Sequence, residues 1–133
     1  MQALLNHKLF RFAIVGGGGF IVDLIVFSLL LELLGFSLGV ARAIAFVVAA
    51  TFTWWGNRIF TFNKAEKTSK LKQWVKFFSV ACFAAIPNFL VFSLLIWLLP
   101  NDVLAPYFAL VAGILVGMLF NYFFSNKWVF KQA

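Results

Sequence analysis

Four long apolar stretches constrain this chain more than any other feature of its sequence. They are Phe12–Leu34, Gly39–Trp55, Phe77–Leu99 and Val103–Phe124. Each is close to the length of about 20 residues that a helix needs to cross a hydrocarbon core of about 30 Å. Because 64% of the 133 residues are hydrophobic and 11% are charged, a soluble domain of this size could not bury its apolar side chains. The sequence therefore predicts an all-α membrane protein, one domain with four transmembrane helices.

The basic residues gather at alternate ends of the predicted spans. The links at 35–40 and 100–106 contain no Lys or Arg. The cations instead precede the first span, surround the link between the second and third, and follow the fourth: Lys8, Arg11, Arg58, Lys64, Lys67, Lys70, Lys72, Lys76, Lys127 and Lys131. By the positive-inside rule, both termini and the central basic loop are predicted to be cytoplasmic.

The same basic clusters do not predict binding to nucleic acid. They flank membrane spans, where attraction to anionic lipid headgroups accounts for a net charge of +7. The chain has one histidine, His7, and one cysteine, Cys82, and it lacks a phosphate-cradling loop or a carboxylate pair suited to catalysis. We therefore expect no enzymatic activity, no cofactor and no metal.

A sequence repeat divides the chain into two halves. V-F-S-L-L occurs at Val26–Leu30 and again at Val91–Leu95. The register of 65 residues that aligns these segments also matches Arg11 with Lys76, Phe12 with Phe77, Val15 with Val80, and Asp23 with Asn88. We predict two helical hairpins, at about 8–62 and 73–131. Since each hairpin has two spans, both insert in the same direction, as parallel repeats related by an axis along the membrane normal.

Both predicted first spans carry weak helix formers beside a polar residue. Gly16–Gly19 precedes Asp23, and Pro87 precedes Asn88. Since glycine and proline weaken helices, the pattern predicts a weakened or kinked segment at matching places in the two halves. Such interruptions indicate a transporter's binding site. The four glycines also fit a close packing surface between membrane helices, and both interpretations stay open.

Two opposite charges are predicted at similar depth on neighbouring spans. Counting from Arg11 places Asp23 about 18 Å into the membrane, and counting from Asn57 places Arg42 about 22 Å from the same face. A charge at mid-bilayer costs several kcal/mol unless it is paired or hydrated. The two residues either form a pair that locks the helices together, or bind substrate. In the second case, Arg42 meets an anionic group while Asp23 orients it or takes up a proton. We prefer the second interpretation because buried ion pairs stabilise a bundle inefficiently.

Asn57 and Asn126 end the second and fourth predicted spans, and each is followed by a cation, Arg58 or Lys127. This pattern is typical of a helix C-cap with a favourable charge at the dipole. It fits equally a corner that binds phosphate through amide and cation donors. The residues alone do not separate these two interpretations.

Several of these motifs resemble the GtrA-like family of small membrane proteins. They are R-F-x-x-V-G from Arg11, A-R-x-I-A-F from Ala41, N-R-I-F-T-F from Asn57, and N-K-W-V-F from Asn126. The resemblance covers nearly the whole chain. It implies flipping of a sugar linked to a polyprenyl phosphate, such as undecaprenyl phosphate, across the bacterial inner membrane for glycosylation of surface polysaccharide.

The resemblance and the residues together define a candidate site. A lipid phosphate at the interface would meet Arg11, Arg58, Lys76 and Lys127. Within the bilayer, the substrate would meet Asp23, Arg42, Asn88 and Asn121, with Asn57 and Asn126 at the cytoplasmic ends. Four helices are few for enclosing a path, which favours a homodimer.

Two alternative functions come from other classes. The chain could be a membrane anchor that recruits a glycosyltransferase through its basic face, in which case the segment Lys64–Lys76 matters and Asp23 and Arg42 do not. It could also be a small exporter of cationic drugs that uses Asp23 as its membrane carboxylate. Arg42 at similar depth argues against the exporter.

Overall fold

The computed structural model describes residues 2–5 and 7–131, and all regular structure in these ranges is helical. A short helix, α1 (Gln2–Leu5), comes first. The four long helices are α2 (Lys8–Ser28), α3 (Leu38–Gly56), α4 (Lys70–Leu98) and α5 (Ala105–Phe124). Three π-helical segments extend α2, α3 and α5: η1 (Leu29–Leu33), η2 (Asn57–Thr61) and η3 (Ser125–Val129). Each long helix, with its extension where present, is long and apolar enough to span a membrane, so the predicted four-span all-α fold is confirmed.

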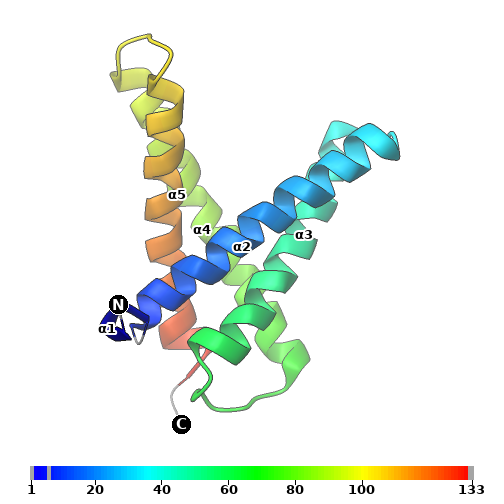
Figure 1. The fold of residues 1–133 in the computed structure, drawn as a ribbon, viewed down its shortest axis with the longest axis vertical. Helices are drawn as coiled ribbons and strands as arrows, with labels where there is room; N and C mark the ends of the chain where they lie inside the picture. The colour runs from blue at the N-terminus through cyan, green and yellow to red at the C-terminus, as the bar shows by residue number, and fades with distance from the viewer. Residues whose placement is uncertain (1, 6, 132–133) are drawn as a thin grey trace.

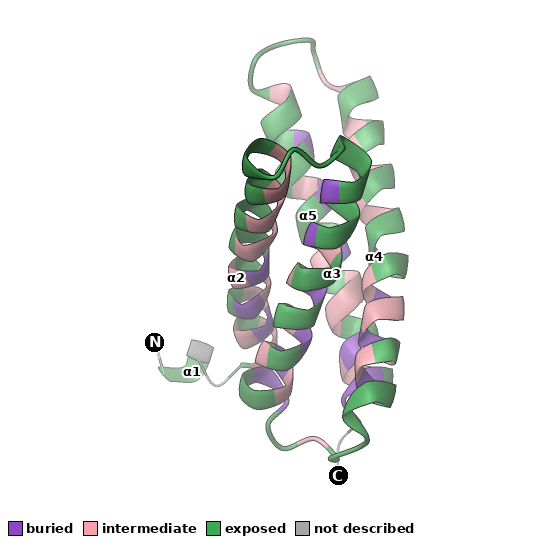
Figure 2. Ribbon diagram, turned by 90° about the vertical axis from the view of Figure 1, so that its right-hand side faces the viewer, coloured by how far each residue is buried: buried purple, intermediate pink, exposed green. Residues whose placement is uncertain are grey.

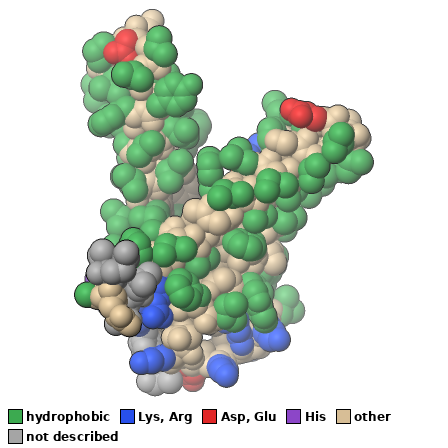
Figure 3. All heavy atoms as spheres, in the orientation of Figure 1, with side chains coloured by type: hydrophobic (Ala, Val, Ile, Leu, Met, Phe, Trp, Pro, Cys, Tyr) green, Lys and Arg blue, Asp and Glu red, His purple; other side chains and the backbone are tan. Residues whose placement is uncertain are grey.

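The long helices form two hairpins, α2 with α3 and α4 with α5 (Figure 1). Both hairpins point the same way, because their short links lie at one end of the molecule and both termini lie at the other (Figure 1). We call the end that holds both termini the basic end, since Figure 3 shows the Lys and Arg side chains gathered there. The hairpins meet at the basic end and diverge toward the other, which gives the molecule the shape of a V.

Aromatic side chains hold the hairpins together at the basic end, where Figure 2 shows much of the buried surface. Phe62 and Phe130 stack with ring centroids 4.6 Å apart and planes 7° apart. Phe12 packs edge-on against Phe62 at 6.3 Å, and Phe77 packs edge-on against Phe130 at 6.0 Å. Each such ring pair contributes about 0.5–1.5 kcal/mol beyond the area that it buries.

These contacts recur between the halves of the chain. Phe77 follows Phe12 by 65 residues, and Phe130 follows Phe62 by 68 residues. Between the hairpins, α3 contacts α4 and α5 contacts α2, the two contacts that a two-fold rotation would exchange. These matching contacts fit the predicted repeat. Their relation by a membrane-normal axis, and the direction in which they insert, stay predictions.

The second span of each hairpin ends differently from the prediction. The α-helical part of α3 has its C-cap at Asn57, but that of α5 has its C-cap at Ser125 and not at Asn126, and each helix continues as a π turn. The N–H of Phe62 donates to the carbonyl of Asn57, and the N–H of Phe130 donates to that of Ser125, both at 2.8 Å. The structural counterpart of Asn57 is therefore Ser125, one residue before the one the sequence alignment indicated.

The structure shows no break in either first span at the predicted weakened segments, and their kinking stays a prediction. α2 is continuous through Gly16–Gly19, and α4 is continuous through Pro87. The last of the four glycines, Gly19, lies so close to Thr53 of α3 that an added Cβ would collide with the threonine methyl group. The first two glycines face open space, so only part of the run serves as a packing surface.

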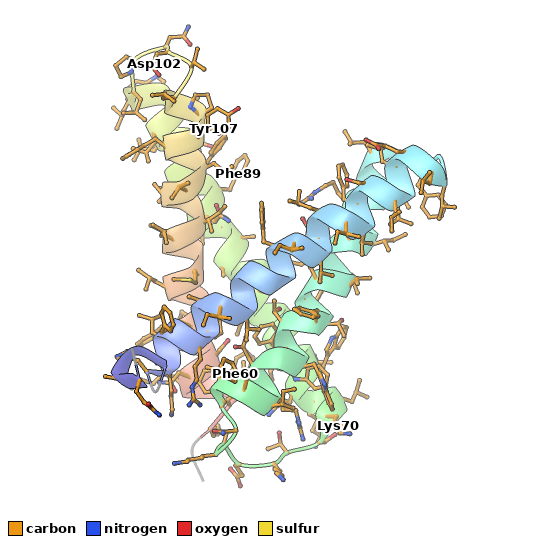
Figure 4. The ribbon with its side chains drawn as sticks, viewed as in Figure 1. Phe60, Lys70, Phe89, Asp102 and Tyr107 are labelled. Atoms are coloured by element: carbon orange, nitrogen blue, oxygen red, sulfur yellow. The ribbon has the colours of Figure 1, made fainter. Side chains whose placement is uncertain are left out.

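Replacing Phe62 with alanine should lower the free energy of unfolding by about 3–5 kcal/mol, because a buried ring is lost from the contact between the hairpins. Phe89→Ala is the matched control, since that ring is 68% exposed on α4 (Figure 4). Unfolding of both variants in mixed micelles would measure the difference. Equal losses would show that the stack does not hold the hairpins together.

Candidate functional site

Asp23 and Arg42 form an ion pair between α2 and α3, with 3.0 Å between Arg42 Nη1 and Asp23 Oδ2. The predicted proximity of the two charges is therefore confirmed. The Arg42 side chain is 53% exposed, and its guanidinium lies 5.2 Å from the centre of the Phe27 ring. One nitrogen bonds to the carboxylate, so the cation keeps donors for another group.

The second oxygen of the Asp23 carboxylate differs from the first in its hydrogen bonding. Oδ1 is buried and has no hydrogen-bond partner among the described residues. A buried acceptor without a donor costs about 1–3 kcal/mol. A water molecule or a hydroxyl group of a ligand would satisfy it. The pair therefore offers one accessible donor and one unfilled acceptor within a single hairpin.

Asn88, the counterpart of Asp23, lies in the other hairpin. A Cβ added at Gly113 of α5 would lie 2.7 Å from both the main-chain and the side-chain oxygen of Asn88. A Cβ added at Gly117 would lie 2.9 Å from Asn88 Cβ. Asn88 is thus enclosed between α4 and α5, and no hydrogen bond joins it to Asp23 or Arg42. The structure brings two of the three predicted mid-membrane residues together and leaves Asn88 apart.

Most of the predicted asparagines face the protein interior at the basic end. Thr61 Oγ1 donates to Asn57 Oδ1 at 2.6 Å, and Asn57 is 1% exposed. Ser125 Oγ donates to Asn121 Oδ1 at 2.9 Å. Asn126 Oδ1 is buried and has no hydrogen-bond partner among the described residues. Asn57 therefore fits a structural role in its π turn better than the predicted corner that binds phosphate.

Four predicted cations at the basic end lie over aromatic rings. Arg11 lies 5.1 Å from the ring centre of Phe60 on η2, which Figure 4 labels, and also donates to its carbonyl at 3.1 Å. The counterparts in the second half repeat this contact, with Lys76 5.5 Å from the ring of Trp128. In the same way, Arg58 lies over Trp54 and Lys127 over Phe123. The rings fix a layer of positive charge without neutralising it.

Gln73 joins the two hairpins and was missed by the sequence analysis. It is 2% exposed, and its Oε1 accepts from Arg58 Nη1 at 2.6 Å and from Trp54 Nε1 at 3.1 Å. Its spacing to the buried Phe77 and Val80 places all three on one face of α4. This spacing was the available signal, but the lysines on either side of Gln73 favoured an exposed position.

The sequence model for the transmembrane domain of GtrA and DPMS matches residues 11–130. The chain belongs to this GtrA/DPMS family. It is 31% identical over 127 residues to the cell wall teichoic acid glycosylation protein GtcA of Listeria monocytogenes, covering 94% of this chain and 86% of the relative. It is 27% identical, with the same coverage, to the GtcA protein of Listeria innocua serovar 6a.

Within this GtrA/DPMS domain, the matched residues extend from the Arg11 cation to the Phe130 ring. They therefore include both polar elements of the candidate site, the Asp23–Arg42 pair and the cation layer. They also include the aromatic stack of Phe62 on Phe130, which fixes how the two hairpins meet at the basic end.

Gly113→Ala should destabilise the α4–α5 hairpin by about 1–3 kcal/mol, because the new methyl group would press on a main-chain oxygen that cannot rotate away. Gly17→Ala is the control, since nothing lies within 4 Å of a Cβ at that position. Unfolding midpoints of the two variants in the same detergent would test this. A loss confined to Gly17→Ala would contradict the packing described for Asn88.

Proposed function

We propose that this protein flips a monosaccharide linked to a polyprenyl phosphate, such as undecaprenyl phosphate, across the membrane without catalysing a chemical change. The observation that carries the proposal is the half-exposed Arg42, a cation within a membrane span that is held by one hydrogen bond to Asp23. Family membership supports a role in handling lipid-linked sugars. The names of the Listeria relatives support a role in glycosylation of surface polysaccharide.

The pair suits the chemistry of such a substrate. A phosphodiester that crosses the bilayer needs a counter-charge at mid-depth, because an isolated charge there costs several kcal/mol. Arg42 has a planar fork of donors that matches phosphate oxygens. Asp23 would hold the fork in place through Oδ2.

The shape of the molecule suits a long lipid tail. Figure 3 shows apolar side chains along both arms of the V and open space between the arms. Phe89 and Tyr107 on the α4–α5 hairpin are 68% and 66% exposed (Figure 4). The isoprenoid would stay in the surrounding lipid while the polar headgroup follows the protein. A second copy of the chain would complete the path, and we propose a homodimer.

The proposed orientation follows from the basic end. It faces the cytoplasm of a bacterial inner membrane, where the substrate is made, so the phosphate first meets the cation layer of Arg11, Arg58, Lys76 and Lys127. The opposite end carries the short links and the acidic groups of Glu32 and Asp102 (Figures 3 and 4).

Transport can be tested with purified protein in liposomes that contain a fluorescent undecaprenyl-phosphate sugar. The protein should speed exchange between leaflets, and Arg42→Ala should abolish this acceleration without reducing insertion. Because Arg42→Ala also leaves Asp23 unpaired, the double variant Asp23→Ala with Arg42→Ala is the necessary control. Full activity of the double variant would show that the pair is only structural, and exchange at the lipid-only rate with the unchanged protein would refute flipping.

A second candidate function is a membrane anchor that recruits a glycosyltransferase. The observation that favours it is the row of exposed lysines at the basic end: Lys64, Lys67, Lys70 and Lys72. An anchor would lose its cellular function when these lysines become glutamine and keep it when Asp23 and Arg42 become alanine. We expect the reverse in a surface-glycosylation assay.

The cation exporter is disfavoured, because Arg42 already occupies one oxygen of the Asp23 carboxylate.

A further inference from the structure

Two hollows open at the basic end on either side of the central loop. The α4 hollow has a volume of about 420 Å³ and is bordered by Arg58, Glu66, Lys67, Lys70 and Gln73 among others. The α2 hollow has a volume of about 360 Å³, and its polar border includes Lys8, Arg11, Asn63 and Lys64. Both volumes fall within the range of small-molecule sites, so charge and hydrogen bonding must decide which of them takes a ligand.

In the α4 hollow, most of the positively charged groups already contact other residues of the protein. Arg58 donates to Gln73 Oε1 at 2.6 Å and to the carbonyl of Thr68 at 3.4 Å. The ammonium of Lys70 lies 5.3 Å from the ring centre of Trp55. Glu66 adds a carboxylate to the border. An anion entering this hollow would compete with internal acceptors and meet a like charge.

Among the described residues, the border of the α2 hollow has three cations and no carboxylate. Lys8 lies 5.8 Å from the ring centre of Phe62, and neither Lys8 nor Lys64 forms an ion pair with a described residue. Arg11 borders the same hollow, where its guanidinium donates to the carbonyl of Phe60 and lies over that ring. The like charges of Lys8 and Lys64 repel each other across the hollow, and an anion bound between them would relieve this repulsion.

The repeat shows that this difference is specific to one half. In the register of 65 residues, Lys8 corresponds to Gln73, and each stands four residues before the ring, Phe12 or Phe77, that packs into the core. In the second hairpin this position holds a neutral amide whose oxygen accepts two internal hydrogen bonds. In the first hairpin it holds an ammonium for which residues 2–5 and 7–131 provide no hydrogen-bond acceptor. At equivalent positions, therefore, the α4 hollow has an amide that already accepts two hydrogen bonds, and the α2 hollow has an ammonium that can donate to an anion.

We propose that the α2 hollow is a binding site for a phosphate group, with Lys8, Arg11 and Lys64 supplying the charge and the amide of Asn63 a further donor. The phosphate of a lipid and free inorganic phosphate share this chemistry. The identification of the ligand as the headgroup of a polyprenyl-phosphate sugar rests on the proposed function. The site would then be where the substrate docks before it reaches Arg42.

Binding of farnesyl phosphate to the protein in phosphatidylcholine nanodiscs tests the proposal. The double variant K8Q/K64Q should weaken binding about tenfold or more, since it removes two charged hydrogen-bond donors to the phosphate. K67Q/K70Q is the matched control, because it removes the same charge from the same end but borders the α4 hollow. It should change binding less than about threefold. Equal weakening by both variants, or by neither, would overturn the site.

Two competitors identify the source of the phosphate. Displacement of farnesyl phosphate by inorganic phosphate at comparable concentration would assign the hollow to free phosphate, and weak displacement would assign it to a lipid. Equal competition by phosphatidylglycerol would replace the site with general attraction to anionic lipid.

The liposome assay separates this inference from the proposed function. Normal transport with unchanged binding in K8Q/K64Q would refute the phosphate site in the α2 hollow but not flipping. Loss of binding in K8Q/K64Q, in a protein that moves no lipid, would refute flipping alone.

Discussion

The stack of Phe62 on Phe130 is the contact on which the arrangement of this molecule depends. Inside a bilayer, lipid tails solvate apolar side chains as well as a neighbouring helix does, so helices associate through close packing and hydrogen bonds. Here both are concentrated at the basic end, in the four phenylalanine rings and in the hydrogen bonds to Gln73. Because few such contacts exist farther along, the hairpins diverge, and the mid-membrane ion pair is left at the surface of one arm.

The two hairpins have the same arrangement of helices but differ in the charge of their side chains. Arg42 in the first hairpin corresponds to Leu110 in the second, in the register of 68 residues set by the π turns. Likewise Asp23 corresponds to Asn88 and Lys8 to Gln73, so at these three positions the first hairpin is charged and the second is neutral. The second hairpin buries its amides in helix contacts and in bonds to Arg58. This division places Arg42 and the Lys8 side of the α2 hollow on the first hairpin, whereas the cation layer at the basic end draws on both hairpins.

Hydropathy and charge placement predicted the four spans, and counting helical rise predicted that Asp23 and Arg42 meet. These features depend on composition and on a fixed rise per residue, which local sequence specifies. The π turns were not predictable in this way, because widening a helix by one residue leaves no side-chain signature, and the register of Asn57 was wrong by that one residue. Glycine has the same ambiguity: Gly19 packs and Gly17 does not, and only the position of α3 distinguishes them.

The distribution of contacts also decides how a substrate would have to move. Lys8 and Asp23 lie on the same face of α2, about 22 Å apart along the helix axis. The residues between them on that face, Phe12, Val15 and Gly19, are buried against other helices. A phosphate therefore cannot pass from the α2 hollow to Arg42 along this face while the aromatic stack is closed. Transfer requires either a path around α2 through lipid or separation of the hairpins at Phe62 and Phe130. Separation would open the aromatic stack beside the proposed docking site, and a closed stack there would block leakage when no substrate is bound.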